Sequence, residues 1–248
     1  MSRQEGFTIL EVTLYLSISA LLAGSLLFGL AAMVRDQEWH DALKSTLNLV
    51  QTQYQAVANN VNSSTTSTCS GTTANAGATN CLLIGRYIYF SGQSYTTGSI
   101  VTDGSAFNGT NSDSTALASA TFQDVNVSRA TSLSWGSTFA NIYSLDDASK
   151  SYNTLAIVRS PISSAIYVVP WNSTTSTQPV FDSSLFSATN TNHSLSIAIY
   201  NGSASGNSGG ALCLAAGSSA SNAVLAAPVA PNSVSSVTAA CNNILVGD

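Results

Sequence analysis

The stretch GFTILE, residues 6–11, opens the part of the chain that decides its fold, and no charged residue follows it between Val12 and Val34. About 20 consecutive apolar residues are enough for a helix to cross a bilayer. Glu11 stands out, because a carboxylate inside a bilayer costs about 2.5 to 3.5 kcal/mol on insertion scales unless something pairs with it. We therefore predict a membrane-inserting helix whose single acidic residue meets a partner.

Two simpler interpretations compete for this segment. A secretory signal peptide has an apolar core of about 7 to 15 residues and a small-residue cleavage site. Residues 29–31, Gly-Leu-Ala, would fit such a site, but the apolar run is much longer than that core. A plain membrane anchor fits the length, yet it leaves unexplained why Gly6 precedes Phe7 and why Glu11 is the fifth residue after Gly6.

The same residues resemble the class III signal of type IV prepilins and pseudopilins. The match comprises a short polar leader, MSRQEG, followed by Phe7 and Glu11 at the start of the apolar run. The resemblance implies that a prepilin peptidase cleaves between Gly6 and Phe7, that the new amine of Phe7 is methylated, and that Glu11 docks neighbouring subunits. It departs from many bacterial pilins in having Phe28 where they carry a helix-breaking proline.

Beyond the apolar run, apolar side chains recur at spacings of three and four residues, which places them on one face of a helix. The residues on this face are Trp39, Leu43, Leu47, Val50, Tyr54, Val57 and Val61. We expect the helix to run from Phe7 to about Asn59 and this face to pack against a sheet. The predicted domain organisation is a leader peptide at 1–6, a transmembrane or filament-core helix at 7–34, its amphipathic continuation at 35–60, and an extracellular β-rich head at 61–248.

After the helix, short apolar or alternating runs predict β-strands. The predicted strands are Leu82–Phe90, Phe122–Val127, Thr154–Val158, Ala165–Pro170, Leu195–Tyr200 and, with the weakest pattern, Ala211–Ala215. Gly85 is interpreted as a bulge, and Pro161 predicts an antiparallel hairpin between the third and fourth strands. The glycine-rich links are expected to be exposed, and they are Gly92–Gly98, Gly104–Ser119 and Gly202–Gly210.

The order of these elements indicates the fold class. Strands do not alternate with helices, which argues against a doubly wound parallel sheet. We therefore expect an α+β fold in which one long helix packs on an antiparallel sheet. The pilin resemblance implies the same fold.

Composition restricts the function classes. Charged residues make up 8% of the 248-residue chain, and its net charge of −5 argues against a general nucleic-acid surface, because phosphate binding relies on clustered Lys and Arg. The basic residues beyond Lys44 are scattered in sequence, at Arg86, Arg129, Lys150 and Arg159. DNA binding, which some pilin-like proteins perform during uptake, remains an alternative if these side chains converge in space. The length favours a minor or elaborated pilin.

The four cysteines all lie in the part of the chain expected outside the membrane, and an even count in an exported chain favours disulfides. Their sequence proximity favours the pairs Cys69–Cys81 and Cys213–Cys241 among three possible connectivities. The second pair would stabilise the fold by about 3 to 4 kcal/mol on the chain-entropy model, and the pilin resemblance implies a C-terminal disulfide of this kind. Zinc is the competing interpretation, but no CxxC pair is present.

The residue types of common active sites are sparse, so we predict no enzymatic activity, cofactor or metal. A nucleophilic triad needs a histidine base, and the histidines are His40, in the predicted helix, and His193, in a polar run. The pair Asp146-Asp147 is a weaker alternative as a calcium site. Six Asn-x-Ser/Thr sequons are as expected by chance in this composition, and they leave glycosylation open; they begin at Asn62, Asn108, Asn126, Asn172, Asn192 and Asn201.

The expected function is that of a structural subunit of a type IV pilus or related filament that supports adhesion, motility or DNA uptake. The expected partners are other pilin subunits, the prepilin peptidase, the assembly platform and, before assembly, membrane lipid. The protein would be a single-pass membrane protein first and part of an extracellular surface filament afterwards. The alternatives are a type II secretion pseudopilin and an uncleaved, membrane-anchored surface adhesin or binding module.

Overall fold

The computed structural model describes residues 8–59, 81–103, 112–120, 122–125, 127–145, 147, 150–173, 194–201, 209–214, 224–229 and 234–245. Two compact units make up the chain, Met1–Glu38 and Trp39–Asp248. Gly6, Phe7, Cys69, Asp146 and His193 lie outside the described residues. The predicted leader, its cleavage site and the Cys69–Cys81 pair therefore remain predictions.

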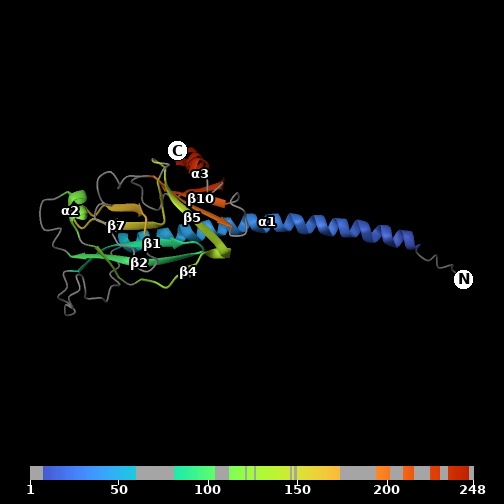
Figure 1. The fold of residues 1–248 in the computed structure, drawn as a ribbon, viewed down its shortest axis with the longest axis horizontal. Helices are drawn as coiled ribbons and strands as arrows, with labels where there is room; N and C mark the ends of the chain where they lie inside the picture. Colours follow the sequence, from blue (N-terminus) through green and yellow to red (C-terminus); the bar gives the residue numbers. More distant parts are fainter. Residues whose placement is uncertain are drawn as a thin grey trace. The chain divides into compact units, whose positions relative to one another are not determined.

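The N-terminal helix α1 spans Ile9–Ala58 (Figure 1). The sequence predicts this helix from Phe7 to about Asn59, and the described part confirms it to within one residue at its C-terminal end. The part of α1 that belongs to the first unit is apolar, and its large side chains between Ile9 and Leu30 are exposed. Its second half carries the predicted amphipathic face.

That face is confirmed from Leu43 to Val57 by burial within the second unit, whereas the Trp39 side chain and Val61 lie outside what the structure describes. Leu43, Val50 and Val57 are buried, and Leu47 and Tyr54 are partly buried. Spacings of three and four residues bring these side chains to one side of the helix. Leu43, Leu47, Val50 and Tyr54 join a core shared with strands from two sheets. As predicted, the amphipathic half of α1 packs against β-structure.

The first sheet, sheet A, is antiparallel and has the strand order β3-β2-β1-β7-β8. Its strands are β1 (Cys81–Ser91), β2 (Ser94–Asp103), β3 (Phe122–Val125), β7 (Thr154–Arg159) and β8 (Ile166–Trp171), and β4 (Thr131–Ser132) pairs with β2. The predicted hairpin across Pro161 is confirmed as the β7–β8 pair. The predicted bulge is confirmed too, because the β1–β2 register shifts between Leu83 and Gly85.

The second sheet, sheet B, is also antiparallel and has the strand order β11-β10-β9-β5-β6. Its strands are β5 (Ser137–Ser144), β6 (Ser151–Tyr152), β9 (Leu195–Asn201), β10 (Gly209–Leu214) and β11 (Val224–Val229). Two of them, β9 and β10, match predicted strands, whereas β5 and β11 carry no alternation strong enough to reveal them. The described structure thus confirms the α+β class but divides the strands between two sheets.

All three links expected to be exposed are wrong in part. Gly209 and Gly210, at the end of the link Gly202–Gly210, are buried in β10, and residues 202–208 lie outside the described residues. Most of Gly92–Gly98 belongs to β2, whose polar start is paired along its length with β1. Pairing of backbone groups, which the sequence pattern does not report, holds these Ser and Thr residues in the sheet. The link Gly104–Ser119 contains helix α2 (Asp113–Ser119), in which Ala116 and Leu117 are buried. A third helix that was not predicted, α3, spans Val234–Leu245.

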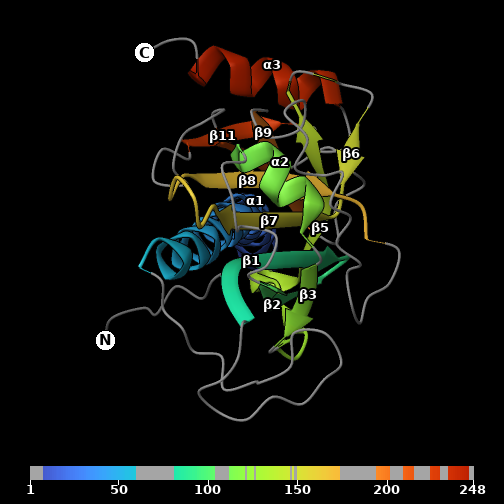
Figure 2. The same cartoon turned by 90° about the vertical axis from the view of Figure 1, so that its left-hand side faces the viewer.

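The second unit has a layered core. One buried cluster lies between the second half of α1 and both sheets, and includes Leu43, Phe90 and Ile197. A second cluster fills the other face of sheet A under α2, and a third lies between sheet B and α3, which rests beside β10 and β11 (Figure 2). Each sheet is therefore covered on both faces. This explains why every residue of β10, and every residue of β7 except the last, is buried.

Candidate functional site

The candidate site with the clearest chemistry is the start of α1. Residues Ile9–Leu30 form a stretch of 22 residues with a mean hydropathy of 1.8, which is long and apolar enough to cross a membrane. At a rise of about 1.5 Å per residue it is about 33 Å long, close to the hydrocarbon thickness of a bilayer. Its large apolar side chains are exposed, with Ile9 85% and Phe28 82% exposed.

Glu11 occupies a defined place in this stretch. Thr8 is the N-cap of α1, and the backbone N–H of Glu11 donates to its hydroxyl oxygen at 3.3 Å. Glu11 is the third helical residue, so Thr8 and Glu11 have the T-x-x-E spacing of a capping box. The spacing of Thr8 and Glu11 in the residues TILE is the sequence signal for this role, which is not among the predictions made above.

The free energies involved distinguish a capping role of Glu11 from a partner-binding role. An acidic residue in the first turn stabilises a helix by about 0.3 to 1 kcal/mol. Immersing that carboxylate in a bilayer costs about 2.5 to 3.5 kcal/mol on insertion scales. Capping does not offset this cost, so an exposed Glu11 at the head of an apolar helix is unfavourable in lipid until a cation approaches it.

Three hydroxyls of the apolar stretch are satisfied within the helix. The hydroxyls of Thr13, Ser17 and Ser25 donate to the carbonyl oxygens of the residues three positions earlier, at 3.0, 2.8 and 2.9 Å. Hydroxyls that bond their own helix carry little cost in an apolar medium. Among these described polar side chains, Glu11 is the one that carries a charge.

One face of the apolar stretch consists of small residues. At about 100° per residue, Thr13, Ser17, Ala20 and Gly24 lie within about 60° of arc. A Cβ added at Gly24 would meet no atom within 4 Å, so this face is open. Small residues on one face let two apolar helices approach closely in a membrane or a similarly apolar environment.

The disulfide between Cys213 and Cys241 is present and joins β10 to α3, with the two Cα atoms 5.5 Å apart. Both cysteines are fully buried in the cluster between sheet B and α3. This confirms one of the two predicted pairs. Sequence reasoning identified the bond without identifying α3, because the count and spacing of cysteines do not depend on secondary structure.

Two of the scattered basic residues come together at the end of α1. Arg86 of β1 donates from Nη1 to Gln53 Oε1 at 3.4 Å, and Arg159 of β7 donates from Nη1 to the Ala58 carbonyl oxygen at 2.9 Å. Their neighbours belong to the chain's own helix, so these two arginines are engaged in holding it. Lys150 pairs with Asp147 at 3.2 Å on the surface, while Arg129 is exposed.

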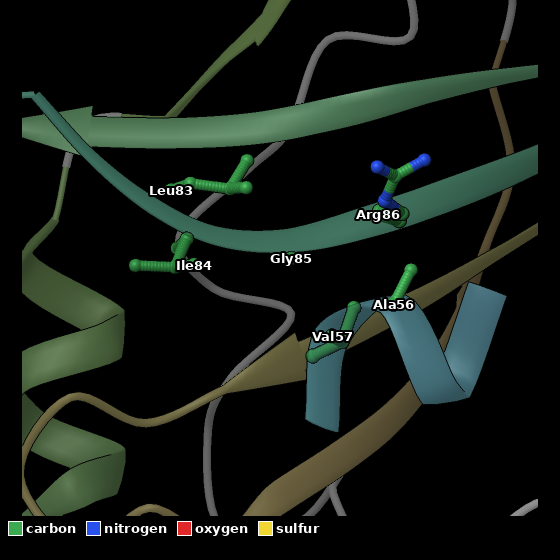
Figure 3. A pocket seen from close by; sticks show the side chains of 6 residues that line it. All are labelled: Ala56, Val57, Leu83, Ile84, Gly85 and Arg86. Carbon is green, nitrogen blue, oxygen red and sulfur yellow. The ribbon is translucent and has the colours of Figure 1, made fainter. Parts of the chain in front are cut away.

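A small pocket lies beside Arg86, between the last turns of α1 and the bulge of β1 (Figure 3). It is lined by Ala56, Val57, Leu83, Ile84, Gly85 and Arg86, and its empty volume is about 200 Å³ including its open mouth. Ligand pockets usually measure about 300 to 1,000 Å³ and are more enclosed. This pocket is therefore too small and too open to define a small-molecule site.

A cluster of hydroxyls surrounds Asp113, the first residue of α2. Its carboxylate accepts hydrogen bonds from Ser160 at 2.6 Å, from Tyr167 at 2.8 Å and from Ser163. Burial by itself would raise the pKa of Asp113, but these hydrogen bonds outweigh it and lower the pKa below its ordinary value. The cluster ties α2 to the β7–β8 turn, and no local sequence pattern predicts it.

A tight turn presents Trp135 to solvent. Trp135 and Gly136 both have positive φ, 59° and 66°, and the N–H of Ser137 bonds the carbonyl oxygen of Ser134. Two successive left-handed residues closed by this bond form a type I′ turn, which favours Asn, Asp or Gly at its first central position. A bulky residue there is strained by about 1 to 3 kcal/mol, yet the Trp135 side chain is 64% exposed.

No group of three or more His, Cys, Asp or Glu side chains able to hold a metal ion occurs within the part of the chain that the structure describes. Comparison with known proteins gives no match to a protein-family model, to a curated protein or to a solved structure.

Proposed function

We propose that the protein is a structural subunit of a type IV pilus or a related filament. The observation that carries this proposal is Glu11, an exposed carboxylate in the first turn of the exposed apolar stretch Ile9–Leu30. The stretch continues as one helix into the core of a β-rich head. A plain anchor needs the apolar length but not the charge.

In the proposed mechanism the precursor inserts with residues 1–6 in the cytoplasm and the head outside. The prepilin peptidase cleaves between Gly6 and Phe7, and the amine of Phe7 is methylated. The positive Phe7 amine of one subunit then neutralises Glu11 of its neighbour. An ion pair in an apolar environment is tolerated where an isolated charge is costly, so the pairing favours assembly and sets the register of the subunits.

The open face of small residues supports the same proposal. Thr13, Ser17, Ala20 and Gly24 would allow the apolar helices of neighbouring subunits to pack closely as they leave the bilayer for the filament. The heads would face outward, where their surface determines adhesion, motility or DNA uptake. The protein itself would be a non-enzymatic minor pilin, and a separate cytoplasmic ATPase would supply the energy for assembly.

The test is mass spectrometry of the N-terminus of protein recovered from sheared cell-surface material. A peptide that begins at N-methylated Phe7 is the expected result. A chain in the membrane fraction that still begins before Gly6 would contradict processing, and it would favour the alternative of an uncleaved, anchored adhesin.

The second alternative, a pseudopilin of a type II secretion system, predicts the same processed N-terminus. Export assays discriminate between the two. Deletion of a pilin abolishes surface filaments, whereas deletion of a pseudopilin retains secreted proteins in the periplasm. We expect the first outcome.

A further inference from the structure

The turn that presents Trp135 is rigid as well as exposed. The Gln93 side-chain amide donates to the Gly136 carbonyl oxygen at 3.3 Å, and the Leu133 N–H donates to the Gln93 carbonyl oxygen at 2.7 Å. On the other side of the turn, the Phe139 N–H donates to the Gly92 carbonyl oxygen at 2.8 Å. The β1–β2 turn thus holds Ser134–Gly136 in place from both sides.

Packing below the turn adds to this rigidity. Leu133 and Phe139 are buried, and the Phe139 ring stacks on Phe90 with centroids 4.6 Å apart and planes within 9° of parallel. The indole of Trp135 therefore stands on a fixed base, with its own backbone in a conformation that L side chains rarely adopt. A left-handed residue that is both bulky and exposed receives no burial within the described head to compensate its strain, and its side chain is open to a ligand.

The surroundings of Trp135 are neutral and rich in hydrogen-bonding groups. Neither residues 91–95 nor residues 131–138 include a charged side chain. Ser94 and Ser132 are paired across β2 and β4, so their hydroxyl groups lie on the same face of the sheet. Gln93 is exposed and Ser134 is partly exposed beside them.

We propose that Trp135 is the aromatic platform of a binding site for a neutral sugar ring. A pyranose has an apolar face of C–H groups and a rim of hydroxyls. The negative face of an indole attracts such C–H groups, while uncharged hydroxyl and amide side chains exchange hydrogen bonds with the rim. A rigid aromatic with adaptable polar neighbours loses little conformational entropy on binding.

An anionic ligand fits the surroundings of Trp135 less well than a neutral sugar does. An anionic ligand would require basic side chains, and the nearest in sequence, Arg129, precedes Trp135 by six residues. The proposal goes beyond filament assembly and does not depend on it, because a single subunit carries the whole turn.

The test uses the full chain, purified in a detergent without a sugar headgroup, and immobilised N-acetylchitotriose, maltotriose and lactose as probes. We expect the wild type to bind at least one of these at millimolar concentration or tighter, and Trp135→Asn to bind about tenfold more weakly or not at all. Trp135→Phe should retain part of the affinity. Ile162→Asn, which removes another exposed apolar side chain, should bind as the wild type does.

Thermal unfolding of the same variants tests whether a loss of sugar binding results from a loss of folding. Asn suits the left-handed position, so Trp135→Asn should raise the Tm by about 2 to 5 °C while it weakens sugar binding at least tenfold. Wild-type protein that binds none of the three sugars would overturn the proposal, as would equal binding by Trp135→Asn. A lowered Tm, or a change in oligomeric size on gel filtration, would also overturn it, because the indole would then serve the head or a second copy.

Discussion

Arg159 of β7 donates a hydrogen bond from Nη1 to the carbonyl oxygen of Ala58, the last residue of α1, over 2.9 Å. The last four carbonyls of a helix lack partners within it, and the last turn of α1 contains no basic residue. A cation at this end satisfies a carbonyl and faces the negative end of the helix dipole. A strand about a hundred residues away in sequence therefore provides the C-terminal cap of α1.

Replacing Arg159 should loosen this junction. We expect Arg159→Met, which keeps much of the aliphatic stem, to lower the free energy of unfolding by about 1 to 2 kcal/mol. The Tm of the head would fall by about 2 to 8 °C in a thermal melt of the full chain in detergent. Arg129→Met, at an exposed site, should change the Tm by less than about 2 °C. Equal shifts in both variants would argue against the cap.

Glu11→Gln separates the two roles of Glu11. Glutamine is accepted at this position of a capping box, so the start of α1 and membrane insertion should be preserved. The negative charge is lost, so we expect subunits to accumulate in the membrane and surface filaments to fall at least tenfold in shear fractions. Glu11→Ala loses both the cap and the charge and should assemble no better. Normal filaments with Glu11→Gln would show that the charge is dispensable.

The small-residue face predicts an orientation-dependent packing defect. Gly24 and Gly29 lie about 140° apart around the helix, and an added Cβ at either meets nothing within 4 Å of the same chain. Gly24→Leu should therefore leave the monomer folded but reduce filament yield strongly, because the leucine separates adjacent helices. Gly29→Leu is the matched control and should assemble much better. Electron microscopy counts of filaments per cell provide the measurement, and indistinguishable counts would refute the assigned face.

Removing the Cys213–Cys241 disulfide should release α3 from sheet B. On the chain-entropy model the double variant Cys213→Ala/Cys241→Ala loses about 3 to 4 kcal/mol of stability. Chemical denaturation and limited proteolysis of the C-terminal segment would both report it. Adding a reductant should then have less effect on this variant than on the wild type. A double variant as stable and as resistant to protease as the wild type would contradict the role assigned to the bond.

The hydroxyl cluster around Asp113 predicts a dependence of stability on acid pH. Because the folded pKa is lowered below its ordinary value of 3.8, the ionised carboxylate stabilises the folded state above that pH. This contribution is lost as the pH falls through the still lower folded pKa. The Tm difference between wild type and Asp113→Asn should therefore be constant above about pH 5 and shrink towards pH 2.

Asp147→Asn is the control for the acid titration. Asp147 pairs with Lys150 on the surface, where an ion pair contributes little to stability, so its Tm difference from the wild type should stay small throughout. A difference for Asp113→Asn that does not vary with pH would mean that the carboxylate does not hold the β7–β8 turn through its charge.

Elements whose burial repeats along the chain could be predicted from the amino-acid sequence. The amphipathic half of α1, the runs that became β1, β7, β8 and β9, and the bulge at Gly85 follow from periods of 3.6 and 2 residues or from a glycine within an apolar run. Glu11 and the pair Cys213–Cys241 could also be predicted, because a single charge in an apolar run and the number of cysteines can be recognised without knowing the fold.

The remaining features depend on contacts between segments that are distant in the sequence, so no local pattern predicts them. The polar start of β2 is a strand because β1 pairs with it, and Gly98 is required there because a Cβ would lie 2.4 Å from the Tyr87 ring. The cap from Arg159, the hydroxyls around Asp113 and the presentation of Trp135 likewise join segments far apart in sequence. The physical reason is that local patterns report burial and turn preference within a few residues, whereas hydrogen-bond partners are chosen by which segments the folded chain brings together.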